Sequence, residues 1–414
     1  MSRPHSTRQR ISPIYRIFIA ALVMDLCVAV VGLAVQLRGG HLGASPSMLG
    51  WLGTVGGFVY ALGCMVTGSL SDRFGRKLLA SASCMLCGLA WLAMTQTDSP
   101  WQLLAILPFS GAGISLFWPP VQAWLSEITV GGRERLNENI GGFNIAWTIG
   151  LFIGPMIAGV AWEYGQPAFG PNLPFLIAVA FVAGMFILLQ TIPARVPGGG
   201  EVAPQETEVV LPHAKVASRF LHLAWIANFA SWFGRGLNIV VFTELGTRSG
   251  FSASTIGTTI AMFLAGQLLM FLYLRDRSGW QYRLWPLVGS LLISAGAWVL
   301  AWVAQSPWVF GIAFAIAGAG SGVTYVSSLY YSLEGQEVSR GARAGLHEAI
   351  LGSGVFLGPL LAGQVMEQFS LRAPYLMTAG VFVGVTIVVY LAWLQMHNGV
   401  RRAAEQARVE VSGE

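Results

Sequence analysis

The chain has 414 residues, of which 54% are hydrophobic and only 10% are charged. This composition excludes an ordinary soluble domain, in which about a quarter of the residues carry charge. It predicts an all-α integral membrane protein, because only helices and closed barrels satisfy every backbone hydrogen bond inside lipid. The formal net charge of +5 alone would also fit a nucleic-acid partner, but its distribution along the chain does not.

Apolar runs separated by short polar connections predict twelve helices, each long enough to cross a hydrocarbon core of about 30 Å. The predicted spans are 14–37, 48–70, 78–97, 101–124, 139–163, 172–192, 218–243, 252–274, 283–304, 307–333, 344–367 and 373–395. We expect five parts: an N-terminal tail 1–13, a six-helix bundle 14–192, a linker 193–217, a second six-helix bundle 218–395 and a C-terminal tail 396–414. The linker is rich in Pro, Gly and Glu and divides the chain into halves.

The distribution of Lys and Arg predicts the orientation of these spans. Twenty of the 24 cationic residues lie in the termini, in the even-numbered connections or at the span ends beside them. Arg38, Arg248 and Arg372 lie in the odd-numbered connections. Because cationic loops stay on the cytoplasmic side, we expect both termini and the linker to be cytoplasmic, in the cell inner membrane. No cleavable signal peptide is expected, since the first apolar segment is too long.

The two halves repeat one another at a nearly constant offset. Asp72-Arg73-Phe74-Gly75 returns 204 residues later as Asp276-Arg277-Ser278-Gly279, and Ser99-Pro100-Trp101 returns after 207 as Ser306-Pro307-Trp308. Gly154-Pro155 likewise returns 204 residues later as Gly358-Pro359. These matches predict two pseudo-symmetric six-helix bundles, related by an axis along the membrane normal, with a site between them near mid-membrane.

A charged connection between the second and third spans identifies a family. The residues 68–77, Gly-Ser-Leu-Ser-Asp-Arg-Phe-Gly-Arg-Lys, resemble the G-x-L-x-D-R-x-G-R-[RK] loop of the major facilitator superfamily. The resemblance implies a twelve-helix secondary transporter that works by alternating access. The run 150–159 also resembles the G-x-x-x-G-P-x-x-G-G element that this family's antiporters carry, although close helix packing alone explains such spacing.

In the family, the loop's aspartate caps the start of span 11, and its second arginine pairs with an acid at the end of span 4 when the cytoplasmic side is closed. Here the resemblance assigns these roles to Asp72, Arg76 and Glu127. With Arg73 and His347, at the start of span 11, they form the expected cytoplasmic gate. We expect its contacts only in the outward-open state. A plain solvated turn is the alternative.

Three ionisable residues lie within predicted spans, where a charge costs at least about 2.5 kcal/mol on insertion scales. Asp25 is too deep for a short carboxylate to reach an interface, so it is a proton-coupling candidate or a structural ion-paired group. Its surroundings loosely resemble the L-D-x-T element of proton-coupled exporters. Arg235 lies in the outer half of span 7, where it faces a cavity or extends to the membrane surface. Glu348 is the second proton-coupling candidate, or it complements the dipole of span 11.

Aromatic and amide side chains are dense where the family's central pathway runs. Such groups combine an apolar face with a polar atom, which suits an amphipathic or aromatic solute. The predicted substrate-binding residues are Trp118, Gln122, Asn144, Trp147, Asn228, Trp232, Arg235, Asn238 and Tyr325.

The sequence favours proton-coupled export of a small organic solute, amphipathic or drug-like. Uptake of a sugar-like or anionic metabolite, with Arg235 contacting the acid, and a non-transporting receptor on the same fold are the alternatives. The span 4 pattern R-x-x-Q-G, linked in the family to proton exchange, lacks its arginine here, since residues 107–111 read Leu-Pro-Phe-Ser-Gly. No enzyme motif, P-loop, cofactor or metal site is expected. We expect a monomer whose partners are its solute, protons and the bilayer, and no nucleic acid.

Overall fold

A computed structural model describes residues 12–196, 214–275, 277, 279–333 and 340–412. Within these ranges the chain is helical. The first half holds α1 (Pro13–His41), α2 (Pro46–Phe74), α3 (Arg76–Met94), α4 (Pro100–Ser115), α5 (Trp118–Ile128), α6 (Gly132–Phe169), the short η1 (Gly170–Asn172) and α7 (Leu173–Gln190). The second half holds α8 (Ala214–Arg248), α9 (Ala253–Arg275), α10 (Leu284–Val303), α11 (Pro307–Leu333), α12 (Arg340–Gln368) and α13 (Ala373–Ser412).

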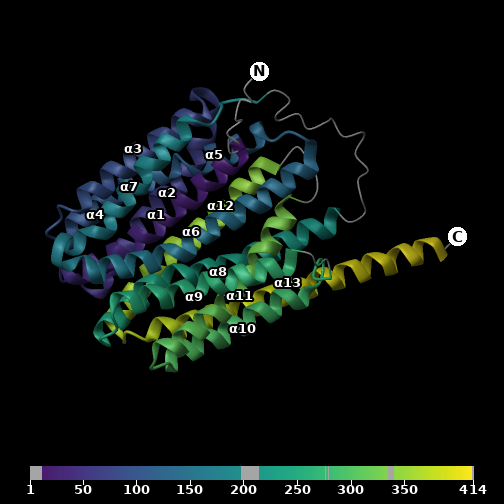
Figure 1. Cartoon of the computed structure of the whole chain (residues 1–414). Coiled ribbons are helices and arrows are strands. Elements are labelled where there is room, and N and C mark those ends of the chain that lie inside the picture. The colour runs from purple at the N-terminus through teal and green to yellow at the C-terminus, as the bar shows by residue number, and fades with distance from the viewer. Residues whose placement is uncertain (1–11, 197–213, 276, 278, 334–339, 413–414) are drawn as a thin grey trace, which may run out of the picture.

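The helices form two bundles that lie side by side, with α1–α7 in one and α8–α13 in the other (Figure 1). The bundles meet mainly where α2 packs on α12 and where α6 packs on α9. In the described ranges, eleven helical segments are long and apolar enough to cross a membrane, with α4 and α5 counted as one. The remaining membrane-length helix, α8, has 35 residues and carries several polar side chains. The predicted all-α fold of two six-helix bundles is confirmed.

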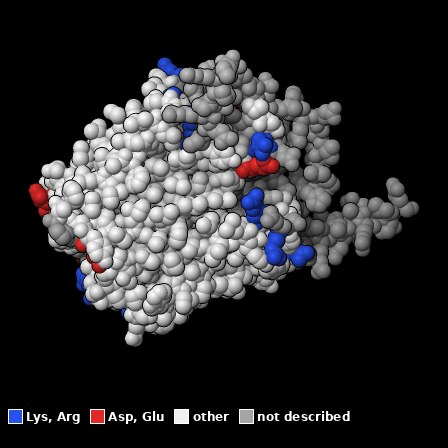
Figure 2. Space-filling model, in the orientation of Figure 1, with Lys and Arg blue, Asp and Glu red and all other residues white. Residues whose placement is uncertain are grey.

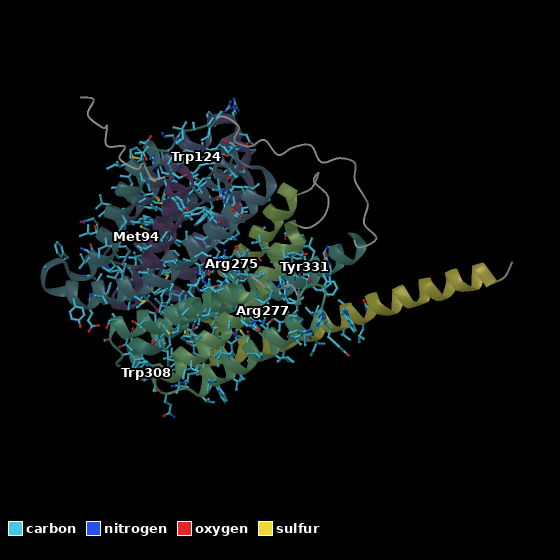
Figure 3. All side chains as sticks on the ribbon, turned by 45° about the vertical axis from the view of Figure 1, so that its right-hand side comes forward. Met94, Trp124, Arg275, Arg277, Trp308 and Tyr331 are labelled. Atoms are coloured by element: carbon cyan, nitrogen blue, oxygen red, sulfur yellow. The ribbon has the colours of Figure 1, made fainter. Side chains whose placement is uncertain are left out.

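Charged side chains lie at the two ends of the molecule and leave an uncharged belt between them, as one face shows (Figure 2). We call the helix ends near the α2–α3 connection the inner ends and the opposite ends the outer ends, following the orientation expected from the Lys and Arg count. α11 illustrates this direction, since Trp308 lies at its outer end and Tyr331 at its inner end (Figure 3).

Two of the differences from the sequence-based boundaries change the shape of the molecule. The span predicted at 101–124 is not continuous: α4 ends at Ser115 and α5 begins at Trp118. Pro119 and Pro120 follow directly, and neither has an N–H to donate to the carbonyl four residues earlier, so the helix breaks. α13 continues past the predicted span end at 395 and projects beyond the other helices (Figure 1).

The Gly-Pro element of α6 packs against both halves at once. A Cβ atom at Gly154 would lie 2.8 Å from the carbonyl oxygen of Leu26 in α1, and a Cβ at Gly159 would collide with the Ala253 backbone of α9. The repeated element of α12 does the same, since Gly358 lies against the α8 backbone and Gly363 against Pro46 of α2. The element therefore joins helices within each half and the two halves to each other.

Candidate functional site

A cavity of about 340 Å³ lies between the two halves, with walls formed by helices of both. Nine of the residues that the sequence singled out line it together: Asp25, Trp118, Gln122, Asn144, Trp147, Trp232, Arg235, Asn238 and Tyr325. The internal repeat predicted a site between the bundles, and this cavity occupies that position. Its size suits a small organic molecule rather than a macromolecule.

An acid and a base from opposite halves face this cavity. Asp25 of α1 is only 8% exposed, and it lines the cavity together with Arg235 of α8. The Cζ atom of Arg235 lies 4.6 Å from the centroid of the Trp232 ring, one turn earlier on the same helix. A guanidinium held over an aromatic face in a dry site gains about 2 kcal/mol. Arg235 therefore lies in the cavity wall over Trp232, and its contact with a solute stays a prediction.

Tyr325 of α11 joins the aromatic wall across the two halves. Its ring centroid lies 5.7 Å from that of Trp147 on α6, 6.2 Å from that of Trp232 and 5.3 Å from that of Phe271. Trp147 belongs to the first half and the other three rings to the second. Ring pairs at these separations stabilise by about 0.5–1.5 kcal/mol beyond their buried area. Trp147, Trp232 and Tyr325 line the cavity and thus present flat apolar surfaces to a solute there, whereas Phe271 packs behind Tyr325.

The amide side chains divide into two groups. The Trp147 indole N–H donates to Asn144 Oδ1 at 2.9 Å, and the Tyr375 hydroxyl donates to Asn238 Oδ1 at 3.5 Å, so both wall amides are held in place. Asn228 is fully buried and is not among the residues that line the cavity. Neither atom of its amide has a hydrogen-bond partner among the described residues. The predicted contact of Asn228 with a solute is therefore absent from the cavity as it stands.

The helix break in span 4 positions two of the predicted residues. Because α5 begins anew at Trp118, its first turn presents the indole ring to the cavity. The centroid of this ring lies 5.8 Å from that of Phe143, in an edge-to-face arrangement. Gln122 lies four residues later on the same helix face and also lines the cavity. The prolines thus shape the wall as well as ending α4.

The sequence reasoning missed four polar wall residues, which are Gln36, Tyr60, Trp91 and Ser110. Gln36 of α1 is 3% exposed, and its Oε1 atom has no partner in the described part of the chain. It follows Asp25 by eleven residues, which is three helical turns, so helical periodicity contained the signal. Tyr60 of α2 and Trp91 of α3 also line the cavity, and the Trp91 indole donates to Ser110 Oγ at 2.9 Å. Lone aromatic residues in apolar helices offered no comparable signal.

The expected gate is only partly within the described residues. Arg76 Nε lies 3.0 Å from Glu127 Oε1, and Arg76 also pairs with Asp72. Arg73 instead lies over the ring of Phe74, at 5.4 Å. His347 and Glu348 lie in α12, but their side chains are outside the described residues, and so is any contact they make.

One expectation about this gate is corrected. The Arg76–Glu127 pair is present although the outer ends of the two halves are in contact through Glu367 and Ser47, so it is not restricted to an outward-open state. The physical reason is that Arg76 and Glu127 belong to the same half. Rocking the halves against each other does not change their separation.

The chain is similar to known proteins over most of its length. The family model described as Major Facilitator Superfamily matches residues 17–339 and 224–411. The chain is 26% identical over 303 residues to the class B tetracycline resistance protein of Escherichia coli, covering 71% of this chain and 73% of that one. It is 24% identical over 286 residues to the niacin transporter NiaP of Acinetobacter baylyi, covering 61% and 64%.

Among solved structures, a bacterial homolog of the human lysosomal transporter Spinster, crystallised in an inward-facing and occupied conformation, has a TM-score of 0.72. It is 16% identical, and the match covers 92% of this chain and 96% of that chain. At this low sequence identity, the likeness shows a shared fold alone. With the family model matching most of its length, the chain belongs to the Major Facilitator Superfamily and is a membrane transporter, not an enzyme.

Proposed function

We propose that the protein is a proton-coupled exporter of a small amphipathic or drug-like organic solute. One observation carries this proposal: Asp25 lies in an aromatic-walled cavity between the halves, which it lines together with the cationic Arg235. A buried carboxyl group that exchanges its partner can also exchange a proton. One relative is a tetracycline resistance protein, and resistance is what export of a drug provides.

The proposed cycle uses competition at Asp25. A solute with a cationic or hydrogen-bond-donating group binds the ionised Asp25 carboxylate from the inner side, while its apolar part lies against Trp147, Trp232 and Tyr325. After the halves rock, a proton from outside displaces the solute. Because solute and proton occupy the carboxylate alternately, they move in opposite directions.

A second candidate is uptake of a small anionic metabolite, favoured by the position of Arg235 over Trp232. A carboxylate bound to Arg235 would leave Asp25 uncompensated in a low-dielectric site, so a proton would bind with it. Anion and proton would then move in the same direction. Niacin, the solute named for one relative, is a small aromatic acid.

The sign of the coupling separates these candidates. In proteoliposomes with an imposed pH gradient, we would test counterflow and accumulation of a cationic aromatic amine and of an aromatic monocarboxylate. Exchange of amine for proton supports export. Accumulation of the carboxylate with protons favours uptake instead. Binding of either solute without any counterflow identifies a receptor and overturns both transport proposals.

We also propose that the protein works as a monomer, in a cell inner membrane, with both termini cytoplasmic. The Lys and Arg distribution supports this orientation. Protease accessibility of tags at the two ends in right-side-out vesicles tests the orientation, and mass measurement in detergent tests the oligomeric state.

A further inference from the structure

Two glutamates at the outer ends each accept a hydrogen bond from the opposite half. Glu163, near the end of α6, has its Oε2 atom 3.1 Å from the backbone N of Ser254 at the start of α9. Glu367, near the end of α12, has its Oε2 atom 2.8 Å from the backbone N of Ser47 at the start of α2. Both contacts therefore join the two bundles across the outer side.

The receiving helix starts are built alike. In α2, the Ser45 hydroxyl accepts from the N–H of Met48 at 3.3 Å, and in α9 the Ser252 hydroxyl accepts from the N–H of Thr255 at the same distance. The first N–H groups of a helix have no partner within the helix, so in each case another amide stays open. A carboxylate is a favourable acceptor there, since the helix N-terminus carries a partial positive charge.

The two contacts follow the internal repeat of the chain. Glu163 and Glu367 are 204 residues apart, the offset of the Gly-Pro elements that precede them. Ser47 and Ser254 are 207 residues apart, the offset of the repeated Ser-Pro-Trp segment. The pseudo-symmetry that relates the bundles thus also relates the two contacts. Two matching cross-half bonds argue against an incidental surface contact.

Each glutamate follows a point where the backbones of the two halves approach closely. One turn before Glu163, Gly159 lies against the Ala253 backbone, and one turn before Glu367, a Cβ at Gly363 would lie 2.7 Å from the Pro46 carbonyl oxygen. Separating the outer ends must pull α9 from α6 and α2 from α12. Such a movement breaks both carboxylate contacts.

We propose that Glu163 and Glu367 are positioning residues of the transport cycle, which form a symmetric outer latch that holds the outer side closed. The latch does not depend on the identity of the solute, on the direction of transport or on proton coupling. It acts through the equilibrium between outward-closed and outward-open states, because its contacts exist in only one of them.

Access to the cavity from outside tests the latch. In a background without Cys27, Cys64, Cys84 and Cys87, a Gln36→Cys reporter in the cavity wall is labelled from the outer side, in right-side-out vesicles, with a membrane-impermeant maleimide. We expect Glu163→Gln and Glu367→Gln each to raise the labelling rate roughly twofold to fivefold, the factor that 0.3–1 kcal/mol at a helix N-terminus represents. If the two sites are independent, the double variant multiplies these factors to roughly fourfold to twenty-five-fold.

Two controls separate opening from loss of structure. Asp98→Asn removes an acid of the outer surface whose charge interacts with Arg38 in the same half. Because this interaction does not join the two halves, the variant should leave the Gln36→Cys labelling rate unchanged. A Ser83→Cys reporter, fully buried in α3 and away from the cavity, should stay unreactive in the double variant.

Hydrogen exchange provides a second measurement with the natural cysteines in place. The backbone amides at the starts of α2 and α9 should exchange faster in the double variant, whereas those at the start of α4 should not. If the double variant is labelled at the parental rate, or if only one glutamate has an effect, the symmetric latch is wrong. Labelling of the Ser83→Cys reporter would also overturn it, because general unfolding would then explain access.

Discussion

Asp25 of α1 and Arg235 of α8 come from opposite halves of the protein and line one cavity. In a low-dielectric cavity each charge makes the opposite charge less costly, so removing one of the two leaves the other uncompensated. Any rocking of the halves changes the surroundings of both charges. Solute binding, protonation and rocking of the halves therefore all affect the same two charged residues.

Replacement of Asp25 tests proton coupling. We expect Asp25→Asn to abolish accumulation driven by a pH gradient while exchange of solute across the membrane continues at least in part. The reason is that an amide cannot load a proton near neutral pH. Transport into proteoliposomes with and without a gradient measures this, and Asp98→Asn, an acid outside the cavity, is the matched control. Gradient-driven accumulation at the parental level in Asp25→Asn would remove Asp25 from the coupling mechanism.

Replacement of Arg235 tests the role of the guanidinium. We expect Arg235→Ala to weaken solute binding more than Arg235→Lys, because lysine keeps the positive charge but not the planar, forked geometry over Trp232. Apparent affinity is measured by solute-dependent tryptophan fluorescence and by counterflow. If both variants bind and transport like the parent, the second candidate function, uptake of an anion, loses its main support.

The inner gate residues are expected to control turnover. Arg76 is held by Asp72 and Glu127, so Asp72→Asn or Glu127→Gln removes one of its two anionic partners. The contact expected across the halves is that of Asp72 with the start of α12, which Asp72→Asn weakens directly and Glu127→Gln weakens by leaving Arg76 to Asp72 alone. We therefore expect each variant to shift the protein toward inward-open and to lower the turnover rate more than the affinity for solute. Spin-label distances between the inner ends of α2 and α12 should lengthen. Glu138→Gln is the control, since Glu138 pairs with Arg135 on an exposed surface, where such pairs contribute little. Distances equal to the parental ones would reduce the loop to a topological anchor.

A glycine pair tests the close packing that supports the cavity. A Cβ at Gly150 of α6 would collide with the carbonyl oxygen of Leu22 and lie 2.8 Å from the backbone N of Leu26, and both atoms belong to the rigid α1. We expect Gly150→Ala to reduce stability by about 1–3 kcal/mol, the usual cost of overpacking. A Cβ at Gly184 of α7 would have no neighbouring atom within 4 Å, so Gly184→Ala should not lower the stability of the protein. Thermal unfolding in detergent compares the two, and equal midpoints would show that α1 and α6 can separate at this contact.

The amino-acid sequence alone was sufficient for the fold and for the individual charged candidates. Lipid cannot satisfy backbone hydrogen bonds, so every span must be a helix with a continuous apolar run, and such runs are visible residue by residue. A charge such as Asp25 or Arg235 inside such a run is equally visible. Because a charge in hydrocarbon is costly, its presence indicates a functional or structural role. The repeat offset then indicated two related bundles with a site between them.

The partners of these residues were decided only by the packing of the halves. Asn228 and Asn238 lie ten residues apart on α8, yet only Asn238 lines the cavity, because ten residues rotate a helix to a different face and the neighbouring helices determine which face is open. Glu163 and Glu367 look like ordinary acids at helix ends until α9 and α2 bring open backbone amides within 3.1 Å and 2.8 Å of them. Contacts between residues far apart in the chain depend on the relative position of rigid helices, and no local pattern in the sequence encodes that position.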